Sequence, residues 1–182
     1  MTGIDRSAGY FRPAMLLIGV ACVAFSGAVG LPLGAVAGYA GGAVDAAISR
    51  TLDILLSFPG ILLPIAIAAP MGAGLWTVIL SVGVVGIPQF ARQVRASVLS
   101  LREQEFINAA RLVGASHLRI LWRHVLPNTL APLIVASTLD VGFFIMAAAG
   151  LSFLGLGAQP PTPEWGVMLS EGRKFIRNAP HL

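Results

Sequence analysis

The chain has 182 residues, of which 56% are hydrophobic and only 11% are charged, and its mean hydropathy is +0.82. Soluble domains carry about 25% charged residues, so the composition excludes an ordinary soluble domain and indicates a surface that mostly faces lipid. The formal net charge is +4, but the basic residues lie in short segments between apolar runs, which indicates membrane topology rather than nucleic-acid binding.

Charged residues are absent from long stretches of the chain. None occurs in residues 13–44 or 54–91, and Asp140 is the only one in residues 124–163. A helix needs roughly 20 mostly apolar residues to cross the hydrocarbon core. The first stretch has room for one crossing, the second for a hairpin of two and the third for one more. The sequence therefore predicts an all-α integral membrane protein, a bundle of about four transmembrane helices.

The first predicted helix covers residues 14–39 and contains Gly30, Gly34 and Gly38, a repeated spacing of four. Glycines four apart share one helix face and let another backbone approach closely. We expect this face to pack against a second helix, although glycine is also generally enriched in membrane helices. Pro32 is expected to kink or loosen the helix, which membrane helices tolerate when neighbours satisfy the freed carbonyl.

The other three predicted membrane helices follow in chain order. The second follows the charged stretch that ends at Asp53 and continues through Leu55, Pro59 and Gly60 to about residue 69. The third covers residues 75–91, and the fourth covers residues 129–150. Each is bounded by Gly, Pro or charged residues that mark turns.

Few residues in these helices are candidates for chemistry. An acid near the middle of a membrane helix is costly and usually faces protein or water, so we expect Asp140 either to line a translocation path or to form a hydrogen bond between helices. Cys22 is the only cysteine, and His117 and His124 have no third ligand near them in the sequence. No metal site is therefore expected.

Basic residues set the expected orientation. Six of the twelve Lys and Arg residues lie in one 32-residue window, and they are Arg92, Arg95, Arg102, Arg111, Arg119 and Arg123. The positive-inside rule places this loop in the cytoplasm. A smaller tail cluster of Arg173, Lys174 and Arg177 argues mildly for the opposite orientation, but the larger cluster outweighs it.

The loop of residues 92–127 is predicted to form two short amphipathic helices separated by Gly114, with Ser116 capping the second. One apolar side of the first helix is expected to comprise Val98, Leu101, Phe106, Ala109, Ala110 and Val113. The stripe of the second comprises Leu118, Leu121, Trp122 and Val125. Such faces need a partner, which is either the lipid headgroup layer or a groove on another protein; composition does not choose between them.

The same loop resembles the EAA signature of prokaryotic ABC importer permeases. That pattern is Glu-Ala-Ala, three residues, Gly, nine residues, an apolar residue, any residue, then Leu-Pro. The positions that match at the correct spacing are Ala109, Ala110, Gly114, Leu126 and Pro127. Asn108 stands where the pattern has Glu, and His124 stands where it usually has Ile. Further stretches at residues 56–60, 92–102 and 151–166 resemble the dipeptide/oligopeptide/nickel branch, and within it the second permease subunit.

This resemblance implies a mechanism and a set of partners. The first half of the loop would be a coupling helix seated in a separate ATPase subunit, so that the closing of an ATPase dimer on ATP switches the membrane helices between inward-facing and outward-facing. The implied partners are a second permease subunit, two ABC ATPase subunits, an extracytoplasmic binding protein and the lipid bilayer. ATP and Mg would bind to the ATPase subunits. This chain has no nucleotide motif and no nucleophile–base pair, so it is not expected to be an enzyme.

Residues 1–182 are expected to form a single transmembrane permease domain of the bacterial cytoplasmic membrane. Family members usually have six membrane helices, so the chain is expected to be truncated at both ends. The expected substrates are di- or oligopeptides. Alternatives are nickel or another small solute, and, from a different class, a non-transport membrane interaction protein whose basic loop lies on anionic lipid.

Overall fold

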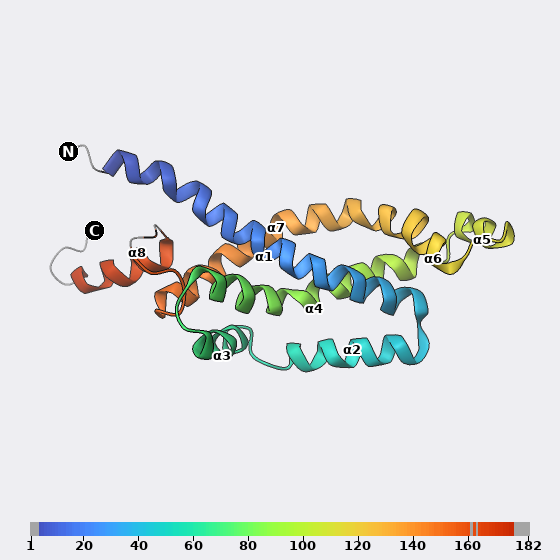
Figure 1. The fold of residues 1–182 in the computed structure, drawn as a ribbon, viewed down its shortest axis with the longest axis horizontal. Helices are drawn as coiled ribbons and strands as arrows, with labels where there is room; N and C mark the ends of the chain where they lie inside the picture. The colour runs from blue at the N-terminus through green and yellow to red at the C-terminus, as the bar shows by residue number, and fades with distance from the viewer. Residues whose placement is uncertain (1–3, 161, 163, 177–182) are drawn as a thin grey trace. The chain divides into compact units, whose positions relative to one another are not determined.

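The computed structural model of the chain describes the backbone of residues 4–160, 162 and 164–176, and the side chains from residue 15 onward within them. The regular elements in this part of the chain are all helices, and no strand occurs there, which confirms the predicted all-α class (Figure 1). Arg177 and both chain ends lie outside the described residues. The elements, in order, are α1 (Ile4–Ala40), α2 (Gly42–Leu56), α3 (Leu62–Met71), α4 (Leu75–Leu101), α5 (Glu105–Leu112), α6 (His117–Ile120), the π-helical turn η1 (Leu121–Val125), α7 (Leu126–Phe153), α8 (Trp165–Gly172) and the 3-10 turn η2 (Arg173–Phe175).

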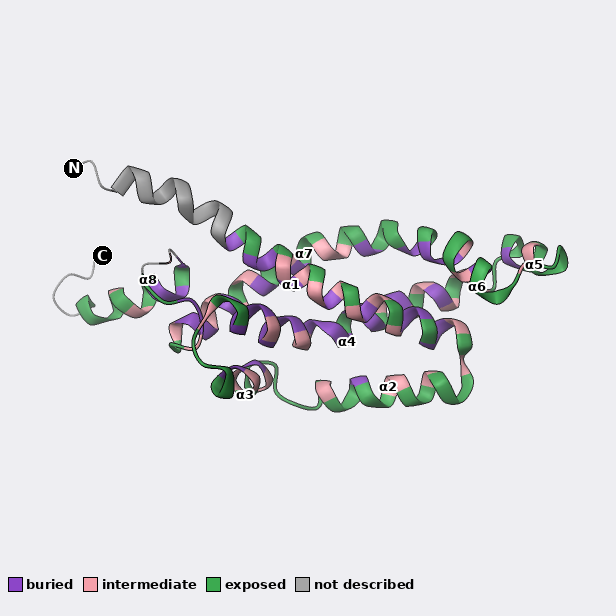
Figure 2. Cartoon of the chain, viewed as in Figure 1, coloured by how far each residue is buried: buried purple, intermediate pink, exposed green. Residues whose placement is uncertain are grey.

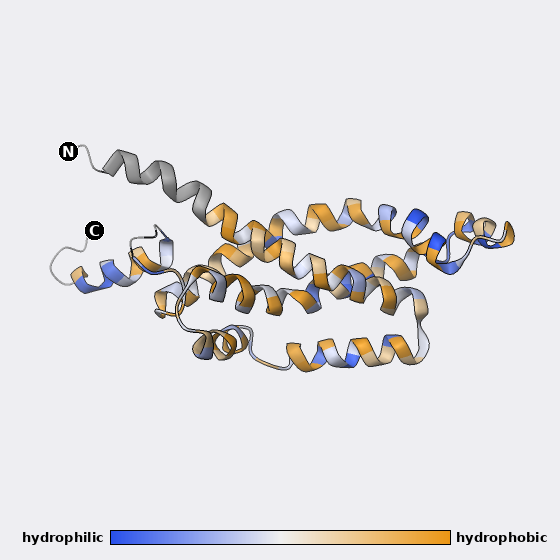
Figure 3. Ribbon diagram, in the orientation of Figure 1, coloured by the Kyte–Doolittle hydropathy of each residue, from blue (hydrophilic) through white to orange (hydrophobic). Residues whose placement is uncertain are grey.

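Three helical segments among the described residues are long and apolar enough to cross a membrane. They are Met15–Ala40, Leu75–Leu101 and His117–Phe153, with mean hydropathies of 2.2, 1.4 and 1.9. Figure 3 colours apolar residues orange, and they occupy most of the length of these helices. The three segments correspond to the first, third and fourth predicted helices; the first has the predicted length, and the other two are longer than the sequence indicated.

The second predicted membrane helix is not continuous. α2 ends at Leu56, and α3 begins at Leu62 after a turn that contains Pro59 and Gly60. Proline has no N–H and disfavours the helical conformation of the residue before it. The helix is therefore interrupted at Pro59, where a continuous helix was predicted. The 10 residues of α3 rise about 15 Å, which is short of the roughly 30 Å hydrocarbon core.

The chain forms two compact units that interleave along the sequence. Unit 1 comprises residues 1–25, 59–85 and 140–182, and unit 2 comprises residues 26–58 and 86–139. Each unit therefore receives part of α1, part of α4 and part of α7.

In unit 1, small residues bring helices into close contact. A Cβ at Gly19 of α1 would lie 2.9 Å from the carbonyl oxygen of Val141 on α7, and one at Gly83 of α4 would lie 2.6 Å from the ring of Phe25. Cys22 is fully buried in this unit, and its Sγ lies 3.9 Å from the carbonyl oxygen of Ile79. The first part of α1 thus packs on both α4 and α7.

Unit 1 also fixes the start of α8. Glu164 precedes α8 and is only 2% exposed. Burial raises the pKa of its carboxyl, while hydrogen bonds from the Ser152 side chain and from the backbone N–H groups of Val167 and Gly166 oppose that rise. Ser152 also accepts a hydrogen bond from the backbone N–H of Ala158 at 3.1 Å. The polar turn before α8 is therefore tied to the end of α7.

In unit 2, the repeated glycines of α1 face the backbone of α4. A Cβ at Gly30 would lie 2.6 Å from the Cβ of Phe90, and one at Gly38 would lie 2.9 Å from the carbonyl oxygen of Arg95. A Cβ at Gly34 would overlap the carbonyl oxygen of Ala91. Figure 2 shows buried residues, in purple, along this part of α4, whereas α2 is largely exposed. The glycine face is thus the seam between the two helices.

Candidate functional site

The helix α5 ends in a hydrogen-bonded stop that requires a glycine. The N–H of Gly114 donates to the carbonyl of Arg111 at 2.9 Å, and the N–H of Ala115 donates to the carbonyl of Ala110 at 3.1 Å. This pair of bonds is the Schellman motif, whose glycine takes a left-handed conformation, and Gly114 has φ +84°. The spacing from Ala110 to Gly114 is therefore the spacing of a helix stop.

The segment after Gly114 begins a helix that is continuous with the long apolar helix α7. The Ser116 hydroxyl accepts a hydrogen bond from the N–H of Arg119 at 3.4 Å, which confirms the predicted cap. From there α6 continues through η1 into α7 without a break. The prediction of a separate second short helix was wrong in this respect, since Pro127 lies inside a continuous helical segment and does not end one.

The wide turn η1 explains how the helix accommodates Pro127. Proline lacks the N–H that would bond the carbonyl four residues earlier, here that of Arg123. π-helical turns are a recognised way of absorbing such an interruption. Asn128 adds a side-chain hydrogen bond to the carbonyl of His124 at 2.6 Å. The Leu126-Pro127-Asn128 sequence thus holds a local widening of the helix that joins the loop to α7.

The apolar side of the loop differs from the predicted stripe. Residues 102–104 separate α4 from α5, so Val98 and Leu101 belong to α4, whereas Phe106 lies on α5 and Val113 follows its last residue. Ile107, which the stripe omitted, is fully buried. The predicted stripe treated residues 98–113 as one helix, although residues 102–104 interrupt it. The predicted buried face of α5 was therefore displaced from the observed one. The large apolar side chains that α5 and the following segment leave exposed are Phe106 (43%), Leu112 (89%), Val113 (89%), Leu118 (67%) and Trp122 (65%).

Three of the loop's six arginines bind groups of their own unit. Arg95 pairs with both carboxylate oxygens of Asp45, through Nε at 2.5 Å and Nη2 at 2.6 Å. Arg92 pairs with Asp53 at 2.5 Å. The third, Arg102, donates from Nη1 to the carbonyl of Gly38 at 3.2 Å. These contacts attach α2 and the end of α1 to α4.

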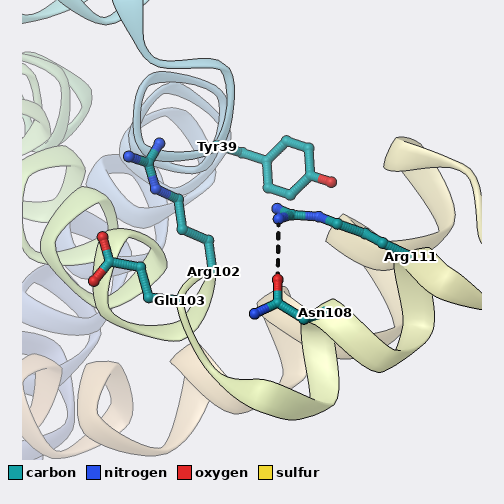
Figure 4. Close-up of a pocket in the computed structure, with 5 residues that line it drawn as sticks. All are labelled: Tyr39, Arg102, Glu103, Asn108 and Arg111. Carbon is teal, nitrogen blue, oxygen red and sulfur yellow. Dashed lines mark hydrogen bonds between the residues drawn. The ribbon is translucent and has the colours of Figure 1, made fainter.

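The loop carries a polar pocket with a volume of about 430 Å³. Its lining residues are Tyr39, Arg102, Glu103, Asn108 and Arg111 (Figure 4). The Tyr39 hydroxyl also lies 3.0 Å from Nδ1 of His117, and the two rings meet edge to face. The end of α1 is thereby connected to the first turn of α6. The sequence does not predict this contact, because nothing local links two residues that are 78 positions apart.

The remaining predicted site residues fall into exposed and buried groups. Asn108, Ala109, Gly114 and Pro127 are exposed, Ala110 and His124 are half-buried, and Leu126 is buried. Asp140 is 8% exposed and lies on α7 in unit 1, so it does not belong to the loop. The part of the chain that the structure describes contains no group of three or more His, Cys, Asp or Glu residues arranged to hold a metal ion.

The fold and the helix–Gly–helix loop define a class of membrane transport protein. Residues 30–176 match the model of the binding-protein-dependent transport system inner membrane component family, and the chain belongs to that family. This confirms the resemblance to ABC importer permeases and the integral membrane character.

Similar proteins come from the branch that the sequence indicated. The chain is 51% identical over 169 residues to the dipeptide transport system permease protein DppC of Alkalihalophilus pseudofirmus, a match that covers 92% of this chain and 56% of that protein. It is 50% identical over 167 residues to the glutathione transport system permease protein GsiD of Escherichia coli O6:K15:H31 and of Shigella boydii, covering 92% of this chain and 55% of each. The chain thus spans about half the length of these relatives.

Proposed function

We propose that this chain is a transmembrane subunit of an ATP-driven importer of small peptides in the cytoplasmic membrane, and that the loop of residues 92–127 docks on a separate ATPase subunit. The observation that carries the proposal is α5 with its Gly114 stop, which presents Ala109 on an exposed helix at the spacing of the family signature. Family membership and the dipeptide and glutathione permeases among the similar proteins support the peptide substrate. On this proposal ATP and Mg bind to the ATPase, and an extracytoplasmic binding protein delivers the peptide.

Physically, the loop is suited to transmit movement because it is continuous with a membrane helix. α5 connects to α6 through the turn of residues 113–116, and from α6 a force passes through η1 into α7 without a break in the helix. Rigid-body movement of packed helices is a common way to switch a bundle between two states. The exposed Leu112, Val113 and Trp122 side chains provide apolar area for a docking contact.

The decisive experiment uses the importer assembled with its paired permease, ATPases and binding protein. Ala109→Trp adds bulk on an exposed face, and we expect at least tenfold weaker ATPase association and loss of peptide uptake. Ala47→Trp, on the exposed part of α2, is the matched control and should leave both unchanged. Unchanged association and uptake in Ala109→Trp would overturn the proposed docking role.

A second pair of variants tests the helix stop. Gly114→Val forces a β-branched residue into a left-handed conformation, and Gly72→Val does the same at φ +78° in the turn after α3. Both carry similar backbone strain, of order 1 kcal/mol or more. We expect only Gly114→Val to abolish ATPase association, whereas equal effects of the two variants would indicate general destabilisation.

Within the same proposal, Asp140 contributes to the translocation path. It is an acid in the long apolar segment of α7, which is a common place for substrate contacts. Asp140→Asn should lower peptide uptake while ATPase association and thermal stability remain as in the original chain. A loss of thermal stability that accounts for the loss of uptake would instead assign Asp140 to an interhelical hydrogen bond.

A further inference from the structure

Arg111 of α5 differs from Arg92 and Arg95 of α4 in the kind of partner that it has. Arg92 and Arg95 each meet a carboxylate, but the side-chain hydrogen bond of Arg111 goes to the neutral amide oxygen of Asn108 at 3.4 Å. That distance is longer than the usual 2.7–3.2 Å range of roughly linear N–H···O bonds. The guanidinium charge is therefore not compensated by this contact.

The surroundings of Arg111 leave room for an incoming group. Arg111 lines the polar pocket, and Figure 4 shows its guanidinium directed toward Tyr39, whereas the Glu103 carboxylate points away from it. Arg102, the second cation of the pocket, is already bonded to the Gly38 carbonyl. The pocket thus presents one exposed guanidinium beside a phenol ring, and its volume of about 430 Å³ admits a side chain from another protein.

Asn108 is the reason that this charge stays available. Residues three apart on a helix are neighbours, and an acid at the first position pairs with a base at the second. Glu at position 108, which the signature has, would neutralise Arg111 within α5. Asn removes that carboxylate and keeps only a weak acceptor. With Glu at position 108, its negative charge would balance the positive charge of Arg111. With Asn at this position, the C-terminal end of α5 carries the uncompensated charge of Arg111.

We propose that Arg111 receives an Asp or Glu side chain of the ATPase subunit, which enters the pocket and forms a two-pronged ion pair with the guanidinium. This inference rests on the proposed function and adds the chemistry of the partner surface. Arginine suits this role because its planar fork matches a carboxylate. The apolar Phe106, Leu112 and Val113 side chains on the same short segment would exclude water around the pair.

Charge complementarity favours a protein side chain over a lipid headgroup. Residues 103–112 contain two acids, Glu103 and Glu105, and one base, Arg111, so their formal net charge is 1 − 2 = −1. Both glutamates are exposed. A flat anionic surface lying against α5 would meet both glutamates as well as Arg111, whereas a single inserted carboxylate meets only Arg111.

The test measures association with the ATPase in a neutral detergent, where no anionic lipid is present. We expect Arg111→Glu to weaken association about tenfold or more, and Arg111→Lys to weaken it less because an ammonium lacks the fork. Asn108→Glu should also weaken association, since the new carboxylate competes for Arg111. Arg50→Glu makes the same charge change on an exposed residue of α2 and is the control that should bind normally.

The outcomes separate this inference from the proposed function. If Arg111→Glu binds normally, or if Asn108→Glu binds more tightly, the carboxylate pairing is wrong. Loss of association in Ala109→Trp would then still support the docking role of the loop. If the Arg111→Glu effect appears only in vesicles containing phosphatidylglycerol, the occupant is a lipid headgroup and the inference is overturned. Thermal unfolding of each variant checks that α5 is intact, and an ATPase acid changed to Arg should restore binding to Arg111→Glu.

Discussion

Arginine side chains in unit 2 divide between internal contacts and exposure. Arg92, Arg95 and Arg102 lie on α4 or directly after it and hold α2 and the end of α1. Arg92 is itself exposed, as are Arg111, Arg119 and Arg123, but these last three make no ion pair among the described residues. A basic loop in a membrane protein is usually read for orientation alone, but here half of its charge stabilises the fold and the other half remains available for a partner.

The Asp45–Arg95 pair makes the stability of unit 2 depend on pH. Hydrogen bonding to Arg95 lowers the pKa of Asp45, with a smaller contribution from the Ser49 hydroxyl and some opposition from desolvation. A carboxyl whose pKa is lower in the folded than in the unfolded state stabilises the fold above the unfolded pKa of about 3.9 and loses that effect as pH falls through the folded pKa. We therefore expect Asp45→Asn to lower the thermal midpoint at pH 7, with the difference from the original chain shrinking below about pH 4.

Asp53→Asn is the matched comparison for that measurement. The Asp53 side chain is 54% exposed and makes a single contact with Arg92, and exposed single contacts contribute little. Its effect at pH 7 should be smaller than that of Asp45→Asn. A difference between Asp45→Asn and the original chain that stays constant from pH 7 to pH 3 would show that the pairing charge is not what stabilises α2.

At the scale of elements, the seam between α1 and α4 depends on the absence of side chains. Without a hydrophobic driving force between helices in lipid, close backbone packing supplies much of the attraction. Gly30, Gly34 and Gly38 are all buried at this seam. Because these glycines have no side chain, the backbones of α1 and α4 can approach closely. Even one added methyl group should therefore disturb the packing.

We expect Gly34→Ala to destabilise the chain although alanine favours helices. The added Cβ would overlap the Ala91 carbonyl oxygen, and overpacking costs about 1–3 kcal/mol against a gain in helix propensity of about 1 kcal/mol. Gly27→Ala is the control on the same helix, since its Cβ would meet only the Phe90 ring at 3.6 Å. Thermal unfolding in detergent should rank Gly34→Ala below Gly27→Ala, and an equal or reversed ranking would refute the seam.

The join between the loop and α7 is a second element-scale feature. Pro127→Ala restores an N–H that can bond the Arg123 carbonyl, and η1 is then expected to narrow into an α-helical turn. A change of one residue per turn rotates α6 by roughly 100° relative to α7. We expect unchanged or higher thermal stability together with at least tenfold lower peptide uptake.

Spin-label distances between α6 and α7 would report the rotation directly. Asn128→Ala, which removes the bond to the His124 carbonyl but keeps the proline, should leave the distance distribution centred where it is. Uptake that survives a measured rotation in Pro127→Ala would show that the geometry of this join does not matter for transport.

At the scale of the whole molecule, the proposed topology places the loop and α8 on opposite sides of the membrane. The segment His117–Phe153 has the length and hydropathy for one crossing, with α5 before it and α8 after it in the chain. Cys22 is the only cysteine and is fully buried, so Cys22→Ala gives a background for labelling. Glu171→Cys should then react with an impermeant thiol reagent added outside intact cells, and Glu105→Cys should react only after permeabilisation.

Both introduced sites are exposed in the structure, so a lack of reaction would reflect topology and not burial. The tail bases Arg173 and Lys174 make this a fair test of the charge argument, since they lie next to Glu171. Labelling of Glu105→Cys in intact cells would reverse the orientation and place the ATPase-docking role of the loop on the wrong side of the membrane.

Much of the candidate site was visible in the sequence because its signals are local. Gly114 ends α5 and Ser116 caps α6, and each signal lies within a few residues of its helix. The spacing from Ala110 to Gly114 is the spacing of the hydrogen-bonded motif that ends α5. The glycine repeat of α1 is equally local, because spacing alone places Gly30, Gly34 and Gly38 on one face. Long charge-free stretches likewise required helices that face lipid.

The remaining features depend on tertiary structure. Whether Asp53 meets Arg50 or Arg92, and whether Tyr39 meets His117, depends on which helices are neighbours, and residue spacing along the chain carries no such information. The break at Pro59 and the passage of the helix through Pro127 show the same limit, since a proline ends one helix and is absorbed in another according to how the freed carbonyls are satisfied. For the basic loop, the sequence by itself determined its charge, its helix stop and its family. Only the tertiary structure decided which arginines are used internally and which remain exposed, because that depends on the groups that folding brings within hydrogen-bonding distance.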